Sequence, residues 1–188
     1  MTANARKLFD ALEFAVKAHH GQFRKGTGIP YVTHPINVGT SLLNYGFPSA
    51  LVIAGFLHDT LEDTKTKEKD ICKRFGERVL KIVLGATEPE HGTKPWRERK
   101  EHTVEHLKSA QQDVVIVSCA DKLDNIRSLI RDHKKNGERL WKRFNAPKED
   151  QKWYYQSLAK VFKARAQTIK NNNIFMKFES EVTSLFGS

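Results

Sequence analysis

The chain has 188 residues, of which 39% are hydrophobic and 29% charged, and its 32 Lys and Arg against 22 Asp and Glu give a formal net charge of +10. This apolar content excludes a natively unfolded basic tail, and the length is typical of one globular domain, which we expect to span residues 1–188. The longest apolar run covers only residues 51–57, whereas a membrane-spanning helix needs roughly 20 residues, so we expect no membrane segment.

Helical periodicity dominates the first half of the chain, where apolar residues recur at intervals of three and four. The spacing predicts a first helix ending before Gly21, a Gly-rich loop over 25–30, a second helix from about 35 to 46, a third from about 49 to 63, and a fourth stripe formed by Ile71, Phe75, Val79 and Val83.

The second half begins with a predicted loop over 88–95, which contains two prolines and a glycine. The segment 113–135 starts with an apolar run that could be a buried strand. We favour a helix because Asp121, Asn125 and Ser128 then share one face. Further helices are expected from Pro147 to about 170 and up to about 186. The pattern therefore predicts an all-α fold of roughly seven to nine helices.

A cluster of ionisable side chains follows the apolar run 51–57. His58, Asp59, Glu62 and Asp63 project onto less than half of the circumference of one helix. Burying carboxylates without a partner costs several kcal/mol, and a divalent cation is a natural compensation. The alternative is a helix end that emerges into solvent, where the acids only decorate the surface.

Two more residues favour the metal interpretation. His34 stands just before a predicted helix start, and Asp121 directly follows an apolar run. Together with His58 and Asp59, they would supply two imidazole and two carboxylate ligands. Mixed nitrogen and oxygen ligation with open positions suits one Mn²⁺ ion, with Fe²⁺ or Zn²⁺ as alternatives.

Three segments, in this order, carry a resemblance to a known family. They are Arg24-Lys-Gly-Thr-Gly-Ile-Pro-Tyr-Val-Thr-His34-Pro, Leu57-His-Asp-Thr-Leu-Glu-Asp-Thr64 and Ala120-Asp-Lys-Leu-Asp-Asn125. The set resembles the HD-domain hydrolases of the RelA/SpoT type, especially the stand-alone small alarmone hydrolases. The resemblance covers about residues 5 to 165 and implies a helical phosphohydrolase domain.

The resemblance also implies an activity. The metal would be held by His34, His58, Asp59 and Asp121, and the reaction would remove the 3′-pyrophosphate of ppGpp or pppGpp. Glu62 and Asp63 match the pair that positions and activates the attacking water. This role agrees with general chemistry, since a metal lowers the pKa of bound water and a nearby carboxylate can accept its proton.

A substrate pocket is implied as well. By resemblance, its walls would be formed by Arg24, Lys25, Tyr31, Asn125, Ser128 and Tyr154, together with the basic segment 94–100, which contains Lys94 and Arg97. For three of these an ordinary structural role stays open. Tyr154 could belong to the core, Ser128 could have no role in binding, and the basic segment could be a solvated helix face. Asp124 departs from the family, because long Rel-type enzymes often carry His there.

Three alternatives remain at this stage. His102 and His106, spaced i and i+4, could form a second metal pair. The same site could hydrolyse another nucleotide or NADPH. A non-catalytic binder of nucleic acid is the third, because residues 131–170 hold 12 basic against 4 acidic residues. No usual nucleic-acid motif is found and such a binder needs no His and Asp cluster, so the hydrolase is favoured.

The charge is divided unevenly along the chain. Residues 1–63 hold five basic and five acidic residues, so the whole excess lies in 64–188, where it could face a nucleotide polyphosphate. No secretory signal opens the chain, and Cys72 and Cys119 are too few for a disulfide framework. We expect two buried thiols in a cytoplasmic enzyme that acts alone on a small guanine nucleotide, with its oligomeric state open.

Overall fold

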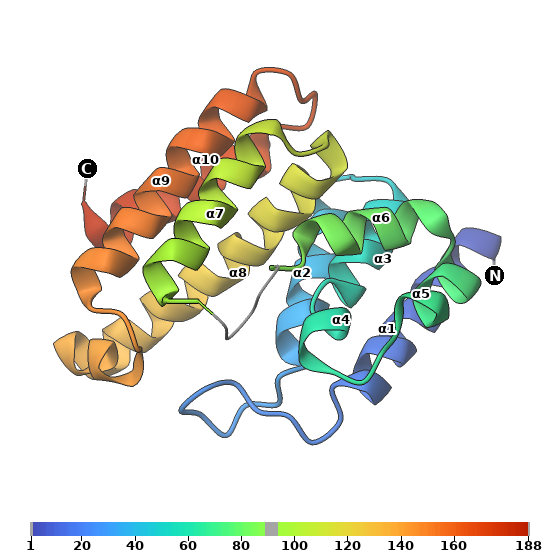
Figure 1. Ribbon diagram of the computed structural model, residues 1–188, viewed down its shortest axis with the longest axis horizontal. Coiled ribbons are helices and arrows are strands. Elements are labelled where there is room, and N and C mark those ends of the chain that lie inside the picture. Colours follow the sequence, from blue (N-terminus) through green and yellow to red (C-terminus); the bar gives the residue numbers. More distant parts are fainter. Residues whose placement is uncertain (1, 89–93, 188) are drawn as a thin grey trace.

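A computed structural model describes residues 2–88 and 94–187 (Figure 1). No strand occurs in these two ranges, and the all-α prediction is confirmed. The helices are α1 (Ala3–Ala18), α2 (Thr33–Asn44), α3 (Ser49–Leu57), α4 (Thr60–Asp63), α5 (Glu68–Phe75), α6 (Glu77–Ala86), α7 (Trp96–Ser109), α8 (Gln112–Asn136), the 3₁₀ helix η1 (Gly137–Arg143), α9 (Lys148–Ala166) and α10 (Asn173–Phe186).

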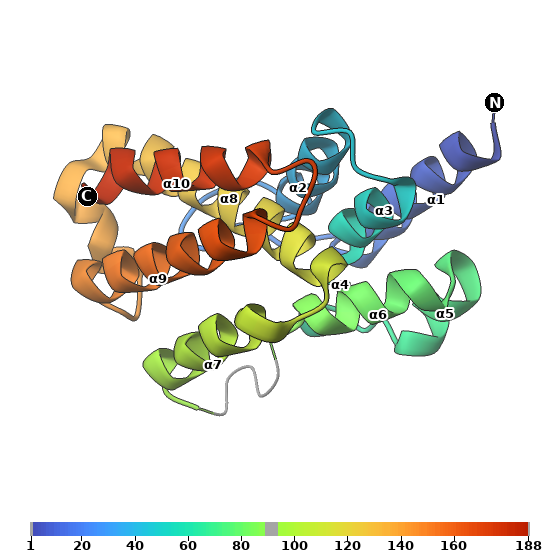
Figure 2. The ribbon, with the colours of Figure 1, turned by 90° about the horizontal axis from the view of Figure 1, so that it is seen from above.

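Helix α8 is the centre of the fold. It has 25 residues and contacts α2, α3 and α6 as well as η1, α9 and α10. Figures 1 and 2 show α9 and α10 on one side of α8, and α1, α3 and α5 on the other. Its stretch 114–121 is buried throughout, which explains why the sequence there reads as an apolar run. The middle of α8 thus lies where the two groups of helices meet.

Helices α2 and α3 pack together unusually closely. Residues 51–57 of α3 are all buried, and a Cβ added to Gly39 of α2 would lie 2.3 Å from the ring of Phe56. A Cβ on Gly55 would in turn lie 3.2 Å from the Cα of Gly39. Only hydrogen side chains at these two positions allow the close approach, which also brings the start of α2 next to the end of α3.

The loop between α1 and α2 folds back on itself. Phe23 and Pro30 form an isolated antiparallel bridge, and the backbone N–H groups of Arg24 and Tyr31 donate to Ile29 and Gln22 at 2.9 and 2.8 Å. These bonds close the Gly-rich turn that the sequence predicted as a loop. They fix Arg24 and Tyr31 relative to the start of α2.

Two expected helices are interrupted. The predicted helix over 49–63 is divided into α3 and α4, and the Thr60 hydroxyl donates to the Leu57 carbonyl across the division at 2.7 Å. The stripe 71–83 is divided into α5 and α6 at Gly76, whose φ of 93° is a left-handed conformation that favours glycine. Both interruptions turn the chain, so these stripes belong to separate helices.

Other expectations can be compared directly. The uncertain segment 113–135 is helical, and the helices expected after Pro147 and up to about 186 are present. Most of the predicted loop 88–95 lies outside the described residues. Cys119 is buried and Cys72 half-buried, and both are free thiols. Among the described helices, none combines the length and apolar character needed to cross a membrane.

Candidate active site

Three side chains from separate helices form a cluster that could hold a metal ion. His34 is the second residue of α2, His58 directly follows α3, and Asp121 lies in the buried part of α8. One ligand atom from each lies within 4.8 Å of the other two. All three residues are buried. Within residues 2–88 and 94–187, no other group of His, Cys, Asp and Glu side chains has this geometry.

The two imidazoles are oriented by acceptors behind them. Nδ1 of His58 lies 2.9 Å from the Gly55 carbonyl oxygen, and Nδ1 of His34 lies 2.7 Å from Oδ2 of Asp124. Because a carbonyl or an ionised carboxylate can only accept, both Nδ1 atoms carry the proton. The Nε2 atoms therefore face the centre of the cluster, as in histidines that bind metals.

The carboxylate of Asp59 lies next to both imidazoles of this cluster. Its Oδ2 lies 3.1 Å from Nε2 of His58 and 3.5 Å from Nε2 of His34, and it accepts a hydrogen bond from the Tyr31 hydroxyl at 2.7 Å. Nε2 of His58 is buried and has no hydrogen-bond partner among residues 2–88 and 94–187. The Asp59 carboxylate thus adjoins both imidazoles of the cluster that they form with Asp121.

The electrostatics of the cluster favour a cation there. Burial works against a charged imidazole, but the neighbouring Asp59 and Asp121 outweigh it and raise the pKa of His58 well above its usual value. Burial likewise works to raise the pKa of Asp121, yet Lys122 and the two histidines hold it well below the usual range. The donor set therefore fits a divalent metal ion, which would replace the protons that otherwise balance the carboxylates.

Glu62 and Asp63 lie beside this cluster on α4. Both line a cavity of about 240 Å³ together with His34, Asp59 and Asp121. Oε2 of Glu62 accepts from the backbone N–H of Glu88 at 3.1 Å, and the Asp63 carbonyl accepts from Gln22 at 2.6 Å. The interruption after α3 thus presents these carboxylates to the same cavity as His34, Asp59 and Asp121.

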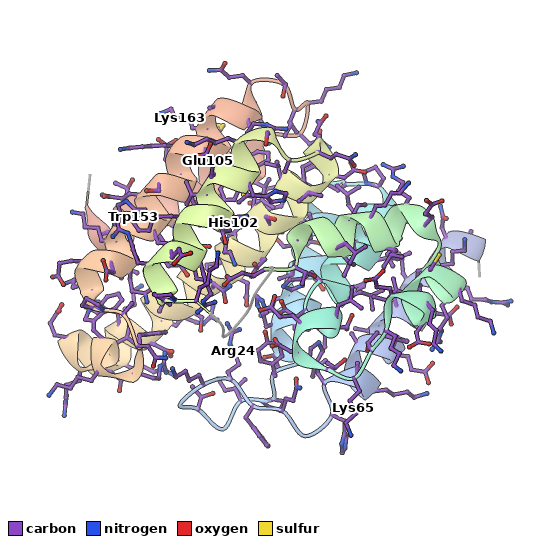
Figure 3. All side chains as sticks on the ribbon, viewed as in Figure 1. Arg24, Lys65, His102, Glu105, Trp153 and Lys163 are labelled. Atoms are coloured by element: carbon purple, nitrogen blue, oxygen red, sulfur yellow. The ribbon has the colours of Figure 1, made fainter. Side chains whose placement is uncertain are left out.

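Cationic and amide side chains surround the other wall of this cavity. The Lys122 ammonium lies 2.7 Å from Oδ2 of Asp121, and the Asn125 amide donates to Oδ1 of Asp121 at 2.6 Å. Arg24 donates to Asp124 at 2.9 Å and to Asn125 at 3.3 Å. Figure 3 shows Arg24 projecting from its loop toward the middle of the molecule.

A second cavity of about 310 Å³ continues from the first. The two share the side chains of Arg24, Tyr31, Lys100, Lys122 and Asn125. The second is lined further by the aromatic residues Trp96, Phe144, Tyr154 and Tyr155 and by the cations Lys25 and Arg143. Such a space suits a ligand with one anionic group near the metal cluster and another group beyond it.

The structure brings most of the predicted substrate residues together. Arg24, Tyr31 and Asn125 line both cavities, whereas Lys25, Ser128 and Tyr154 line the second. Tyr154 is buried, so its ring is part of both the core and the cavity wall.

Lys94 and Arg97 line neither cavity. The guanidinium of Arg97 stacks over the Trp153 ring at 3.3 Å and forms ion pairs with Glu101 and Asp150 at 2.9 and 3.0 Å. Lys94 pairs with Glu98 at 3.1 Å. The side chain of the basic segment that reaches both cavities is Lys100, one turn after Arg97.

Sequence reasoning missed several cavity residues. Lys122 follows Asp121 and could have been noticed from that position alone. Lys100 belongs to the predicted basic segment but was not singled out within it. It forms an ion pair with Glu88 at 2.5 Å, and burial together with the charge of Lys122 lowers its pKa. Arg143 comes from η1, which has no sequence signal toward the site. His102 and His106 of α7 also line the first cavity, and their rings stack on each other. Neither belongs to the candidate metal group found among the described residues.

The fold and the site define a class of protein. A family model described as HD domain matches residues 11–151. The chain belongs to the HD-domain family, which confirms the resemblance found in the sequence.

Two relatives within this family carry the same enzyme name. The chain is 39% identical over 128 residues to the guanosine-3′,5′-bis(diphosphate) 3′-pyrophosphohydrolase of Aquifex aeolicus, an alignment that covers 67% of this chain and 18% of that protein. It is 37% identical over 134 residues to the Homo sapiens protein with the same enzyme name, covering 70% of this chain and 74% of that one. The chain thus spans about a fifth of the Aquifex relative and most of the human one.

Solved structures agree with the sequence relatives. A metazoan ortholog of SpoT, described as hydrolysing ppGpp, superposes with a TM-score of 0.77 at 28% identity, over 100% of this chain and 97% of that chain. A Listeria monocytogenes protein superposes with a TM-score of 0.72 at 32% identity, over 82% of this chain and 99% of that chain.

Proposed function

We propose that this chain is a metal-dependent hydrolase that removes the 3′-pyrophosphate of ppGpp and pppGpp, giving pyrophosphate with GDP or GTP. We infer that residues 1–188 act as one domain and that the metal is Mn²⁺. The observation that carries the proposal is a cavity lined by His34 and Asp121, which belong to the candidate metal cluster with His58, and by Glu62 and Asp63. The names of the relatives support the choice of substrate.

The reaction uses this arrangement as follows. An ion held by His34, His58, Asp59 and Asp121 would polarise the phosphoryl oxygens and lower the pKa of the attacking water. In the proposed reaction Glu62 accepts the proton of that water, and Asp63 helps to hold the water in position. The water oxygen forms a bond to the phosphorus while the bond between the phosphorus and the 3′-oxygen breaks. The proton taken from the water is then available for the released 3′-oxygen, so pyrophosphate leaves and the ribose regains a 3′-hydroxyl.

The cations around the first cavity would bind the phosphates of the substrate. Arg24, Lys100 and Lys122 line both cavities, so they can contact a pyrophosphate at the metal cluster and neutralise charge as the bond breaks. The nucleoside would extend into the second cavity, where Tyr154 and Trp96 offer aromatic faces. We infer that Lys25 and Arg143, which also line the second cavity, pair with the 5′-phosphates.

A non-catalytic nucleic-acid binder explains less of the structure. Such a protein has no need for buried imidazole and carboxylate donors that converge with Glu62 and Asp63 on one cavity. The basic residues of 131–170 are spread over α8, η1, α9 and the segment that follows α9. Arg143 is the one that lines the second cavity as the structure describes it.

One assay tests the proposal. Purified protein is incubated with ppGpp, pppGpp, GTP, dNTPs or NADPH, with Mn²⁺ or after chelation, and pyrophosphate is separated from orthophosphate. We expect pyrophosphate release from ppGpp and pppGpp with Mn²⁺, loss after chelation, and recovery when Mn²⁺ is added back. The variant Asp121→Asn, which removes one proposed ligand charge, controls for contaminating phosphatases.

The same assay can reject the proposal. Activity that survives chelation would contradict a metal mechanism. Orthophosphate from NADPH, with no turnover of ppGpp, would keep the hydrolase class and assign another substrate. No hydrolysis of any substrate by Mn²⁺-bound protein would favour the binder.

A further inference from the structure

Asp124 is buried beside the metal cluster, one turn after Asp121 on α8. Its side chain is 9% exposed, and its carboxylate is bonded from three directions. Oδ2 accepts from Nδ1 of His34 at 2.7 Å and from the guanidinium of Arg24 at 2.9 Å, while Oδ1 accepts from the Asn37 amide at 2.9 Å. One oxygen thus joins a metal-binding histidine to a phosphate-binding arginine.

The bond to His34 determines what that imidazole can do. A carboxylate that accepts from Nδ1 fixes the tautomer and the ring plane, and it makes Nε2 a more basic ligand. Nε2 of His34 lies 3.2 Å from Oδ1 of Asp121, on the side of the cluster. Without this acceptor, the imidazole of His34 could carry its proton on Nε2, and a protonated Nε2 cannot bind a cation.

The bond to Arg24 holds the guanidinium at the cavity wall. Arg24 is 15% exposed, and its two terminal nitrogens bond to the neighbouring residues Asp124 and Asn125 at 2.9 and 3.3 Å. The charge of Asp124 compensates the partly buried cation, and the adjacent acceptors fix its plane. A planar group held in this way can meet a phosphate without losing further side-chain freedom.

We propose that Asp124 is a positioning residue that holds His34 for metal binding and Arg24 for phosphate binding through the same carboxylate oxygen. The Arg24 part of the proposal rests on the proposed hydrolase function. The His34 part rests on the cluster alone. The two sites are thereby linked by one side chain, at a position where the sequence departs from the long Rel-type pattern.

Two substitutions separate the effects of contact and charge. Asp124→Ser removes the acceptor from both partners and leaves room for water. Asp124→Asn keeps an oxygen for His34 and Arg24 but loses the charge, so it should recover part of the function. Asp113→Asn makes the same chemical change in the first turn of α8, where Asp113 pairs with Arg78 at 2.9 Å and is remote from the cluster.

The first measurement is Mn²⁺ binding to the metal-free protein, followed by the electron paramagnetic resonance of free Mn²⁺. We expect Asp124→Ser to weaken the Mn²⁺ Kd about 10- to 100-fold, as for other residues that support metal ligands. Asp124→Asn should fall between Asp124→Ser and wild type. Arg24→Ala and Asp113→Asn should stay within about 3-fold, because neither removes the acceptor behind His34.

The second measurement is the KM for ppGpp at saturating Mn²⁺. Asp124→Ser and Arg24→Ala should each raise KM. The double variant Asp124→Ser/Arg24→Ala should have a KM only slightly above that of Asp124→Ser, because Arg24 has already lost its position in that variant. This readout depends on the substrate, whereas the Mn²⁺ titration does not, so a wrong substrate assignment leaves the first test intact.

Two results would overturn the proposal. Wild-type Mn²⁺ affinity in Asp124→Ser would show that His34 needs no support from Asp124. Fully additive KM effects in the double variant would show that Arg24 is held independently. Thermal unfolding of each metal-free variant shows whether it is folded, and if Asp124→Ser is not, Asp124→Asn carries both tests with an expected Kd change of about 10-fold.

Discussion

The two ends of the cavity are built in different ways. At the metal end, His34, His58 and Asp121 are buried in or directly after three helices, and a hydrogen bond to each side chain helps to fix its direction. At the far end, Lys25 and Arg143 come from a loop and from η1 and remain partly exposed. The difference suggests that the metal end sets the chemistry with high precision, while the far end recognises charge with side chains that can adapt.

The largest effect should follow from a change at the metal end. Glu62→Gln removes the carboxylate proposed to accept the proton of the attacking water, and we expect kcat to fall about 10²- to 10⁴-fold. Mn²⁺ affinity should stay close to wild type, because Glu62 is not among the proposed ligands. Steady-state kinetics and Mn²⁺ titration measure both, with the exposed Glu68→Gln as the control. A near-normal kcat would assign proton transfer to another group.

The helix contact under the metal end gives the next effect. Gly39→Ala places a Cβ 2.3 Å from the Phe56 ring, so α2 and α3 must separate. We expect a loss of about 1–3 kcal/mol in the free energy of unfolding, typical of overpacking. Gly28→Ala is the control, because no described atom lies within 4 Å of a Cβ there. Equal stability of the two variants in denaturant unfolding would contradict the importance of this contact.

The metal end could be predicted from sequence for a physical reason. Burial of ionisable groups is costly without partners, so a histidine or aspartate directly after an apolar run stands out, as His58 and Asp121 do. The close packing of Gly39 and Gly55 was not predicted, since it depends on which faces of two helices meet. The division of α3 from α4 was missed because neither glycine nor proline marks it in the sequence.

The far end could be predicted only in part. Lys25 and Tyr154 were found through family resemblance, not through any pattern of their own. Arg143 escaped because an exposed cation in a basic stretch looks the same in sequence whether it faces solvent or a cavity. Distance in the chain adds to this, since the methylenes of Arg143 pack against Gly26 from the other half of the protein.

A smaller effect is therefore expected at the far end. Arg143 pairs with Asp132 at 2.5 Å, and its Nε is buried with no hydrogen-bond partner in the described part of the chain. Arg143→Ala should raise the KM for ppGpp about 10-fold with little change in kcat, as expected for one lost charged hydrogen bond of about 1.5 kcal/mol. The exposed Arg139→Ala on the same 3₁₀ helix is the control. A selective fall in kcat would instead link Arg143 to the reacting phosphate.

The smallest effect separates two cations of one helix. Lys100 reaches both cavities, but the guanidinium of Arg97 is occupied by Trp153 and Asp150 on α9. Arg97→Ala should leave KM and kcat within about 2-fold and lower the free energy of unfolding by about 1 kcal/mol, because it loses a ring contact and partly exposed ion pairs. Lys100→Ala should raise KM. If Arg97→Ala raised KM as much as Lys100→Ala, the substrate would have to extend along the outer face of α7, and the sequence-based assignment of Arg97 would be preferred.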